Sequence, residues 1–293
     1  MPTACVFGYV TKEWEIHPGG IIREIVGGGA YFVSVALRSL GASVRLIVRM
    51  CECDRHLLEE LSSMGISVEL IPSSTTMKCR LRYERDGSRT IEVIEPAQPF
   101  EPSDVSKCIY ADAVYVGPQT QNDFSLEFLE RASRVAPLFL DVQGFTRRVV
   151  NGVVHYVDWE WKGEASRFVD TLKVDDKEAR ILTGRSNIVE SLNALHELGF
   201  KNVLLTTNEG VYLSTPDSRF FARYKVARVV GRTGRGDTAV AAYMYSRMMG
   251  LDPRQGIALV AAAVSIKLGS VGPLRASLDA VLSLSKEIEV EEL

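Results

Sequence analysis

Hydrophobic and polar positions follow two different rhythms along this chain. Short apolar runs typical of buried strands occur at residues 4–10, 44–48, 113–116, 138–142, 171–174 and 203–206. Apolar residues that recur every three or four positions indicate helices at residues 30–40, 56–64, 125–135, 188–198, 239–249 and 256–268. Strands that alternate with helices predict an α/β fold, in which a mostly parallel sheet carries helices on both faces. No linker divides the chain, so we expect a single domain over residues 1–293.

One segment, at about residues 75–96, breaks this alternation. Met77, Cys79, Leu81 and Tyr83 alternate with charged residues, and a second strand follows at 88–95 after Asp86-Gly87. This pattern predicts a β-hairpin with one apolar face. The hairpin is predicted to be a lid over a ligand or a surface shared with another subunit. The alternative is an edge hairpin of the main sheet.

Composition narrows the class of protein. The chain has 293 residues, 46% of them hydrophobic, and a net charge of −3, which excludes a disordered chain and makes a nucleic-acid partner a poor candidate. No apolar run approaches the roughly 20 residues that span a bilayer, and no basic region precedes the first apolar stretch. We therefore expect a cytoplasmic protein with no membrane partner. Five cysteines, an odd number, argue against a disulfide framework and for free thiols.

The strongest chemical signal is the turn Gly231-Arg-Thr-Gly-Arg-Gly-Asp237, placed between a predicted strand at 224–230 and a buried helix. Glycines let consecutive N–H groups face one point, and the helix N-terminus adds partial positive charge, so the turn can bind an anion. Asp237 falls in the first helical turn, where we expect its carboxylate to stay ionised. Beside a phosphate site it has the properties of a general base, although an ordinary helix-terminal acid is the alternative.

Two other phosphate-binding motifs fit less well. Gly234-Arg-Gly-Asp-Thr-Ala239 matches the dinucleotide fingerprint G-x-G-x-x-A, but a helix follows where that motif needs a strand with an acidic end. The sequence contains no P-loop. A second glycine turn, Gly27-Gly28-Gly29, opens the helix at 30–40 and would let backbone approach a ligand or simply connect strand to helix.

These motifs together resemble the ribokinase (PfkB) family of sugar and nucleoside kinases. Gly27-Gly28 with Ala36-Leu37-x-x-Leu40-Gly41 resembles its N-terminal signature, and Thr233-Gly234-x-Gly236-Asp237 resembles its more specific C-terminal signature. The resemblance covers nearly the whole chain. It implies a three-layer α/β/α domain with a small β-hairpin lid, and ATP and Mg²⁺ as cofactors.

The resemblance also assigns roles to individual residues. Asp237 would be the catalytic base, and the N–H groups of Gly234, Arg235 and Gly236 the anion hole. Asp175-x-x-Glu178 resembles the family's Asn-x-x-Glu, which acts on Mg²⁺ through water; Asp175 replaces the Asn. The nucleotide would meet the turn that contains Thr206, Asn208 and Gly210, and residues 262–269 would flank the adenine.

Several positions depart from the family pattern. Phe32 occupies the position at which the family usually has an Asn that contacts the sugar. Glu13 is the acidic residue nearest to the place of a family Asp, and Gly231 occupies the position of an acidic residue. Arg235 replaces a small residue and is either an extra phosphate ligand or a solvated side chain. The stretch Asp141-Val-Gln-Gly-Phe-Thr-Arg147 and the turn Gly27–Tyr31 look most like the myo-inositol kinase branch.

We therefore predict a kinase that transfers the γ-phosphoryl group of ATP to a hydroxyl of a small sugar or cyclitol, with a myo-inositol-like acceptor favoured. Its acceptor site would be formed by Glu13, Gly27, Gly28, Phe32 and Gln143. A nucleoside kinase and a catalytically degenerate regulator that only binds its ligand are the alternatives. A homodimer through the lid is possible.

Overall fold

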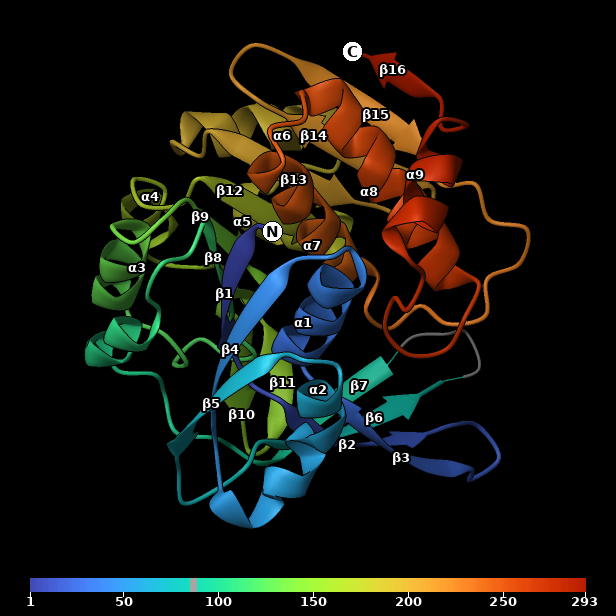
Figure 1. The fold of residues 1–293 in the computed structure, drawn as a ribbon. Coiled ribbons are helices and arrows are strands. Elements are labelled where there is room, and N and C mark those ends of the chain that lie inside the picture. The colour runs from blue at the N-terminus through green and yellow to red at the C-terminus, as the bar shows by residue number, and fades with distance from the viewer. Residues whose placement is uncertain (85–88) are drawn as a thin grey trace.

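The structure, a computed structural model, describes residues 1–84 and 89–293. Its centre is a ten-stranded sheet (Figure 1). From edge to edge the strands are β16 (Val290–Glu292), β15 (Arg219–Arg223), β14 (Gly210–Ser214), β13 (Asn202–Thr206), β12 (Thr171–Asp175), β9 (Leu138–Asp141), β8 (Ala113–Gly117), β1 (Thr3–Gly8), β4 (Ser43–Met50) and β5 (Ser67–Pro72). The seven strands from β13 to β5 are parallel, and β14, β15 and β16 pair antiparallel at the other edge. The predicted mostly parallel sheet is confirmed.

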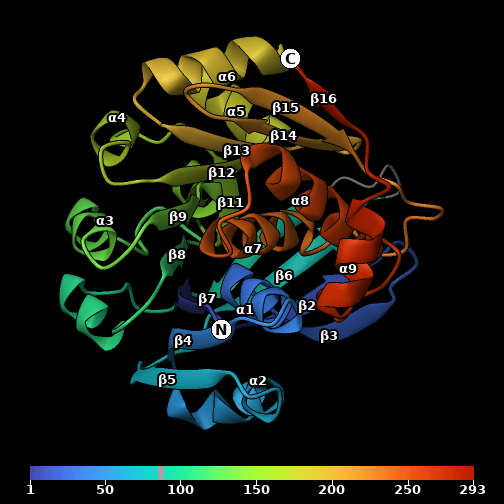
Figure 2. The same ribbon diagram turned by 45° about the horizontal axis from the view of Figure 1, so that its top comes forward.

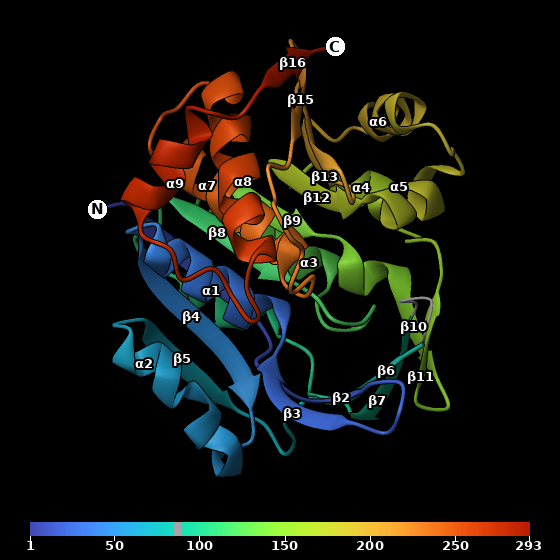
Figure 3. The same cartoon turned by 90° about the vertical axis from the view of Figure 1, so that its right-hand side faces the viewer.

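Helices cover both faces of this sheet, which gives the predicted three layers (Figures 2 and 3). One face carries α1 (Gly29–Ser39), α7 (Arg235–Met248), α8 (Pro253–Leu268) and α9 (Leu278–Ser285). The other carries α3 (Leu126–Ser133), α4 (Lys162–Ala165), α5 (Asp176–Thr183) and α6 (Ile188–Glu197), while α2 (Glu59–Ser63) and the 3₁₀ turns η1 (Glu52–Leu58), η2 (Pro102–Lys107) and η3 (Gln143–Thr146) complete the connections. Along β1, Ala4 and Val6 join one core while Cys5 and Phe7 join the other, as alternation along a strand requires.

A separate six-stranded sheet stands off the main one. In order it contains β10 (Arg147–Val150), β11 (Val153–Tyr156), β7 (Arg89–Glu95), β6 (Lys78–Tyr83), β2 (Thr11–Ile16) and β3 (Ile22–Gly27). Its β6–β7 pair is the predicted hairpin, and its place in a second sheet rules out the edge-hairpin alternative. The Asp86-Gly87 turn lies outside the described residues. The sheet is larger than the segment 75–96, because strands from two other parts of the sequence, 11–27 and 147–156, join the hairpin (Figure 3).

The strand predicted at residues 224–230 is wrong. β15 ends at Arg223, and the chain then runs on without strand pairing to the start of α7. Val229 and Val230 are 47% and 51% exposed, and the Val230 N–H donates to the Leu268 carbonyl 2.8 Å away. The apolar residues Val229 and Val230 resemble the end of a strand in sequence, but the backbone here hydrogen-bonds to the end of α8 and not to another strand.

The cysteines also differ from expectation. The fold places Cys5 beside Cys108 and Cys51 beside Cys53 as disulfides, with Cα–Cα separations of 5.9 and 5.2 Å, and leaves Cys79 free. The odd number of cysteines did not exclude pairs, because Cys5 and Cys108 meet only once β1 and the end of η2 are packed together. Among the described residues, no helix is long and apolar enough to cross a membrane.

Candidate active site

A cavity of about 300 Å³ opens between the second sheet, the ends of the central strands and the start of α7. It is lined by most of the residues expected from the sequence: Glu13, Gly28, Phe32, Gln143, Asp175, Thr206, Asn208, Gly234, Arg235, Gly236 and Asp237. Gly27, Gly210 and Glu178 lie behind this lining. Residues that are up to 224 positions apart in the sequence, such as Glu13 and Asp237, thus face one space.

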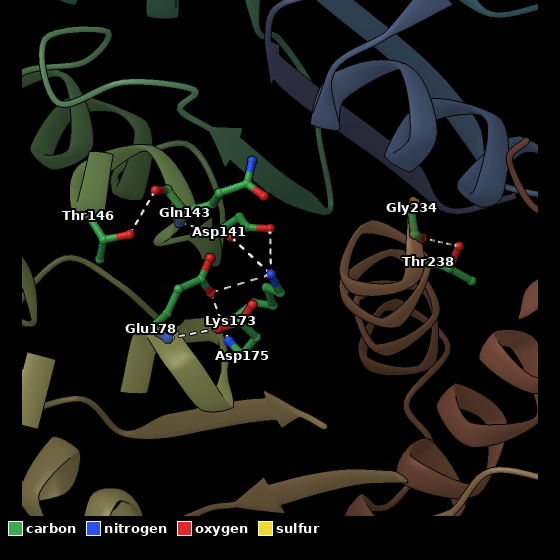
Figure 4. A network of polar contacts seen from close by, with 8 residues as sticks. All are labelled: Asp141, Gln143, Thr146, Lys173, Asp175, Glu178, Gly234 and Thr238. Atoms are coloured by element: carbon green, nitrogen blue, oxygen red, sulfur yellow. Dashed lines mark hydrogen bonds and ion pairs between the residues drawn. The ribbon is translucent and has the colours of Figure 1, made fainter. Parts of the chain in front are cut away.

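The predicted anion-binding turn lies at the start of α7. Gly234 has a φ of 84°, a left-handed conformation that favours glycine, and α7 begins at the next residue. The Thr238 hydroxyl donates to the Gly234 carbonyl at 2.8 Å (Figure 4). The Arg235 N–H donates to the Arg232 carbonyl at 3.2 Å, so of the three N–H groups predicted for the anion hole this one already has a partner, while Gly234 and Gly236 keep theirs at the helix start. Asp237 follows in the first turn of α7.

The charge state of Asp237 differs from expectation. Burial, with the neighbouring Asp141 carboxylate adding to it, raises the pKa of Asp237 to about 7 although Lys173 opposes the shift. The sequence predicts that the helix N-terminus keeps the Asp237 carboxylate ionised. With a pKa of about 7, the carboxylate is instead only partly ionised near neutral pH. A carboxylate with a pKa near neutrality is well matched to accept a proton and to release it again.

Lys173, on β12, is the centre of a buried polar network (Figure 4). Its ammonium lies 3.0 Å from Asp141 Oδ2 and 3.7 Å from Glu178 Oε2. Burial alone would lower the pKa of Lys173, but these carboxylates raise it overall, so the side chain stays charged. A β-carbon on Gly236 would lie only 2.6 Å from Lys173 Nζ, which places a fixed positive charge directly under the turn.

Asp175 and Glu178 cap the start of α5. The Glu178 N–H donates to Asp175 Oδ1 and the Asp175 N–H donates to Glu178 Oε2, both at 2.7 Å. Burial raises the pKa of Glu178 to about 8. Glu178 thus faces the helix start and Lys173, whereas Asp175 opens onto the cavity.

The carboxylates of Asp175 and Asp141 are suitable ligands for a magnesium ion. Asp175 and Asp141 both line the cavity, and carboxylate oxygens are ligands that Mg²⁺ accepts, commonly with several waters retained. Within residues 1–84 and 89–293, no three such side chains are gathered closely enough to hold an ion by themselves.

Glu13, on β2, is buried in the wall of the cavity. The Thr11 hydroxyl donates to Glu13 Oε1 at 2.6 Å, and a β-carbon on Gly27 would lie 2.3 Å from the Glu13 carboxyl carbon. Gly27 therefore makes room for this carboxylate rather than lining the site itself. Burial raises the pKa of Glu13, while Thr11 and two nearby arginines, Arg89 and Arg147, oppose the rise. An apolar wall from the hairpin completes this end: Met77, Cys79, Leu81, Ile91 and Val93.

Phe32 has a role that the sequence did not indicate. It lies on α1, whose N-cap Gly28 has a φ of 92°, and it is 5% exposed. A β-carbon on Gly234 would lie 2.4 Å from Phe32 Cδ1, so the ring packs against the anion-binding turn. Phe32 supports the turn while its remaining edge lines the cavity. Gln143 lies in η3, and its side chain extends toward α7 (Figure 4).

The far end of the cavity contains Thr206, Asn208, Arg232 and Arg235. The Arg235 guanidinium donates to Asn208 Oδ1 at 2.7 Å, so the predicted phosphate ligand and the predicted nucleotide turn are in contact. The buried Thr206 hydroxyl has no hydrogen-bond partner among the described residues. Gly210 stays behind the lining, where its N–H donates to the Thr207 hydroxyl at 3.1 Å.

Sequence reasoning did not single out five charged or polar lining residues: Arg89, Gln119, Thr120, Arg147 and Lys173. Arg147 ends the motif that begins at Asp141, which was the available signal. Lys173 precedes the Asp175-x-x-Glu178 motif by two positions, so alternation along β12 could have placed it on the same face as Asp175.

A glycine turn at a helix start, a buried carboxylate in the first turn of that helix and a small sheet over an α/β/α core are the features expected of a phosphotransferase of the ribokinase-like fold. Residues 5–280 match the pfkB family of carbohydrate kinases, and the chain belongs to this family. It is accordingly a phosphotransferase that acts on a hydroxyl acceptor.

Several known proteins are similar to this chain. The cytidine kinase of Thermococcus kodakarensis is 25% identical over 258 residues, which cover 83% of this chain and 88% of that kinase. A pyrophosphate-dependent kinase in the ribokinase family, solved with a pyrophosphate analogue and myo-inositol, shares 27% identity at a TM-score of 0.88 and covers 96% of this chain and 99% of its own. Arabidopsis thaliana ribokinase, solved with ribose and ATP, shares the fold at 19% identity and a TM-score of 0.78, over 97% of this chain and 99% of its own.

Proposed function

We propose that this kinase phosphorylates a hydroxyl of a small cyclitol or sugar, with myo-inositol as the favoured acceptor. The observation that carries the proposal is the buried Glu13 carboxylate, which faces the same cavity as Asp237 and Gln143. A carboxylate accepts hydrogen bonds from two neighbouring ring hydroxyls, and the Gln143 amide both donates and accepts. The apolar hairpin wall suits the C–H face of a ring. The similarity to a kinase solved with myo-inositol supports this acceptor.

The reaction follows from the positions of the charged groups. Asp237 takes the proton of the acceptor hydroxyl, the hydroxyl oxygen forms a bond to phosphorus, and the bond between phosphorus and the donor's bridging oxygen breaks. The N–H groups of Gly234 and Gly236 and the Lys173 ammonium beneath the turn favour the negative charge on the phosphoryl oxygens. Mg²⁺, when bound, would neutralise donor charge, and Asp175 would hold it through water with Glu178 fixing Asp175 in place.

We propose inorganic pyrophosphate as the donor, with the expected ATP as the alternative. Two guanidinium groups, Arg232 and Arg235, line the donor end, and a cavity of about 300 Å³ is at the lower end of the range for small-molecule sites. The lining includes no described residue of 262–269, which the family resemblance placed beside adenine. A second inorganic phosphate fits this end better than a nucleotide. The similarity to a pyrophosphate-dependent kinase supports the same donor.

A nucleoside kinase is the second candidate, favoured by the similarity to a cytidine kinase and by the apolar wall of the hairpin. The proposal is tested with a panel of myo-inositol, hexoses, ribose, cytidine and adenosine, each offered with pyrophosphate and with ATP. A nucleoside with the highest kcat/KM would promote the second candidate. A chain that binds acceptors but transfers phosphate to none of them would instead be a regulator.

We also propose that two copies associate through the second sheet. Its described strands expose apolar side chains, of which Ile22 is 63%, Ile94 47% and Val150 44% accessible. Sedimentation at several concentrations tests this, because a homodimer gives twice the mass of the chain. The cytoplasmic location expected from the sequence stays a prediction.

A further inference from the structure

The guanidinium group of Arg147 has no part in the reaction described so far. Arg147 is only 6% exposed, and it lines the same cavity as Glu13 and Asp237. Its Nε is buried and has no hydrogen-bond partner among the described residues. A buried charge without a partner is costly, so arginines in such surroundings are normally paired with an anion. The cavity is therefore shaped to receive negative charge at this point.

The backbone fixes Arg147 at the junction between the main domain and the second sheet. It is the first residue of β10, directly after η3, and it pairs with Tyr156 of β11. Its carbonyl accepts the Gln121 N–H at 3.1 Å. Figure 4 shows η3, marked by Gln143 and Thr146, on the side of the site that faces the N-terminus of α7. Arg147, the residue after η3, lines the same cavity as Gly234 and Gly236 of the anion-binding turn.

The charge of Arg147 acts on two carboxylates of the site, those of Glu13 and Asp237. The positive charge of Arg147 opposes the rise in the pKa of Glu13. It also opposes, to a small extent, the rise in the pKa of Asp237. The acceptor oxygen and the phosphorus must meet between these two carboxylates. The Arg147 Nε–H has no hydrogen-bond acceptor among the described residues, and an arriving phosphoryl group would supply one.

We propose that Arg147 is a catalytic residue that binds the oxygens of the phosphoryl group during transfer, an inference that rests on the proposed function. As the acceptor O–H gives its proton to Asp237 and the O–P bond forms, the P–O bond to the leaving phosphate or nucleotide breaks. The transferred group is then held by the N–H groups of Gly234 and Gly236 together with Arg147. This contact is stronger in the transition state than with bound acceptor, which is the condition for a gain in kcat.

The competing explanation is that Arg147 binds an acidic group on the acceptor itself, such as a phosphate monoester or a carboxylate. The two explanations differ in what the residue does to a neutral acceptor. In the first, it acts on kcat for every acceptor. In the second, it acts on the KM of acidic acceptors, and neutral ones are poor substrates.

The test compares the wild type with Arg147→Met and Arg147→Lys, and uses Arg148→Met as the matched control, because Arg148 is the exposed next residue of β10 and does not line the cavity. Kinetics are measured with the best neutral acceptor and donor of the panel. We expect Arg147→Met to lower kcat by at least about 100-fold, in the range of other phosphoryl-transfer arginines, with KM for the acceptor little changed. Arg147→Lys keeps the charge but loses the bidentate geometry, so we expect an intermediate kcat.

A second readout does not depend on turnover. In melting experiments, the phosphorylated product should stabilise the wild type and Arg148→Met but lose most of its effect on Arg147→Met, whereas the neutral acceptor should stabilise all three equally. An active wild type whose Arg147→Met variant keeps its kcat, or changes only KM, overturns this inference and leaves the proposed function intact. A wild type that transfers phosphate to no acceptor overturns both.

Discussion

The ammonium of Lys173 lies directly beneath Gly236, so close that a β-carbon at this position would be 2.6 Å from Nζ. The same ammonium is 3.0 Å from Asp141 Oδ2. One buried cation therefore connects the anion-binding turn to the carboxylates at the ends of β9 and β12. Glycine at 236 is required by this contact and not by its backbone conformation, because no positive φ occurs there.

Gly236→Ala should displace Lys173 and misalign the turn. We expect kcat to fall by about 10²-fold, the size expected when reacting groups shift by about 1 Å. Gly163→Ala in α4 is the matched control, because no atom lies within 4 Å of its added β-carbon, and its activity should equal that of the wild type. Steady-state kinetics decide the matter, and equal activity of the two variants would show that Lys173 does not depend on Gly236.

Asp237→Asn should lower kcat by about 10²–10⁴-fold, since the amide cannot accept the proton. The raised pKa has a second consequence for stability. Because the folded pKa of about 7 exceeds the ordinary value of 3.8, Asp237 stabilises the fold less as pH rises from 4 to 7. Asp237→Asn should therefore melt at a higher temperature than the wild type at pH 8 and lose most of this advantage at pH 5. Near-normal turnover of the variant would remove Asp237 from the base role.

Lys173 sets the pH dependence of the reaction. Lys173 lowers the pKa of Asp237, so the wild type should gain kcat/KM as pH rises through about 7, and Lys173→Met should move this rise to higher pH. The variant should also be slower at every pH, because the turn loses the charge beneath it. Lys201→Met, an exposed change of the same type, serves as control. A rise at the same pH in both variants would contradict the coupling between Lys173 and Asp237.

Glu13→Gln should weaken acceptor recognition. The amide turns one hydrogen-bond acceptor into a donor and mispairs a ring hydroxyl, which should cost about 1–3 kcal/mol in kcat/KM. Glu24→Gln, on β3 of the same sheet but more than half exposed, should leave kcat/KM unchanged. An acceptor panel that shows equal losses for myo-inositol and for nucleosides would assign Glu13 a structural role only.

Arg235 lines the proposed donor site and should affect donor binding. Arg235→Ala removes a cation from the positive end of α7, so the empty protein should melt at the same or a higher temperature. On addition of pyrophosphate, however, the variant should gain less stability than the wild type. Arg228→Ala, an exposed arginine outside the cavity, should gain as much as the wild type. Equal gains in all three proteins would make Arg235 a surface residue.

The sequence predicted the parts of the site that are local in the chain. Gly234, Gly236 and Asp237 lie within one turn of α7, and Asp175 and Glu178 within one helix cap, so spacing alone indicated their geometry. Contacts between distant segments were not predictable in this way. Lys173 under Gly236, Phe32 against Gly234 and Glu13 beside Gly27 each join elements that only the folded sheet brings together.

The same distinction explains the errors in the fold. The hairpin of β6 and β7 was visible as alternation, but β10 and β11 join it through pairings between segments about 60 residues apart. At 224–230 the chain has the composition of a strand, yet its partner is the last turn of α8. Local propensity could not show that no free sheet edge was available there.

Phosphorus NMR of the purified wild type with myo-inositol, Mg²⁺ and either pyrophosphate or ATP tests the central claim most directly. The account predicts a new phosphomonoester signal with pyrophosphate, orthophosphate formed in equal amount, and loss of both in Asp237→Asn. If the phosphomonoester formed only with ATP, ATP would replace pyrophosphate as the proposed donor, and the proposed acceptor would be unaffected. The absence of any phosphomonoester with both donors across the whole acceptor panel would contradict the account.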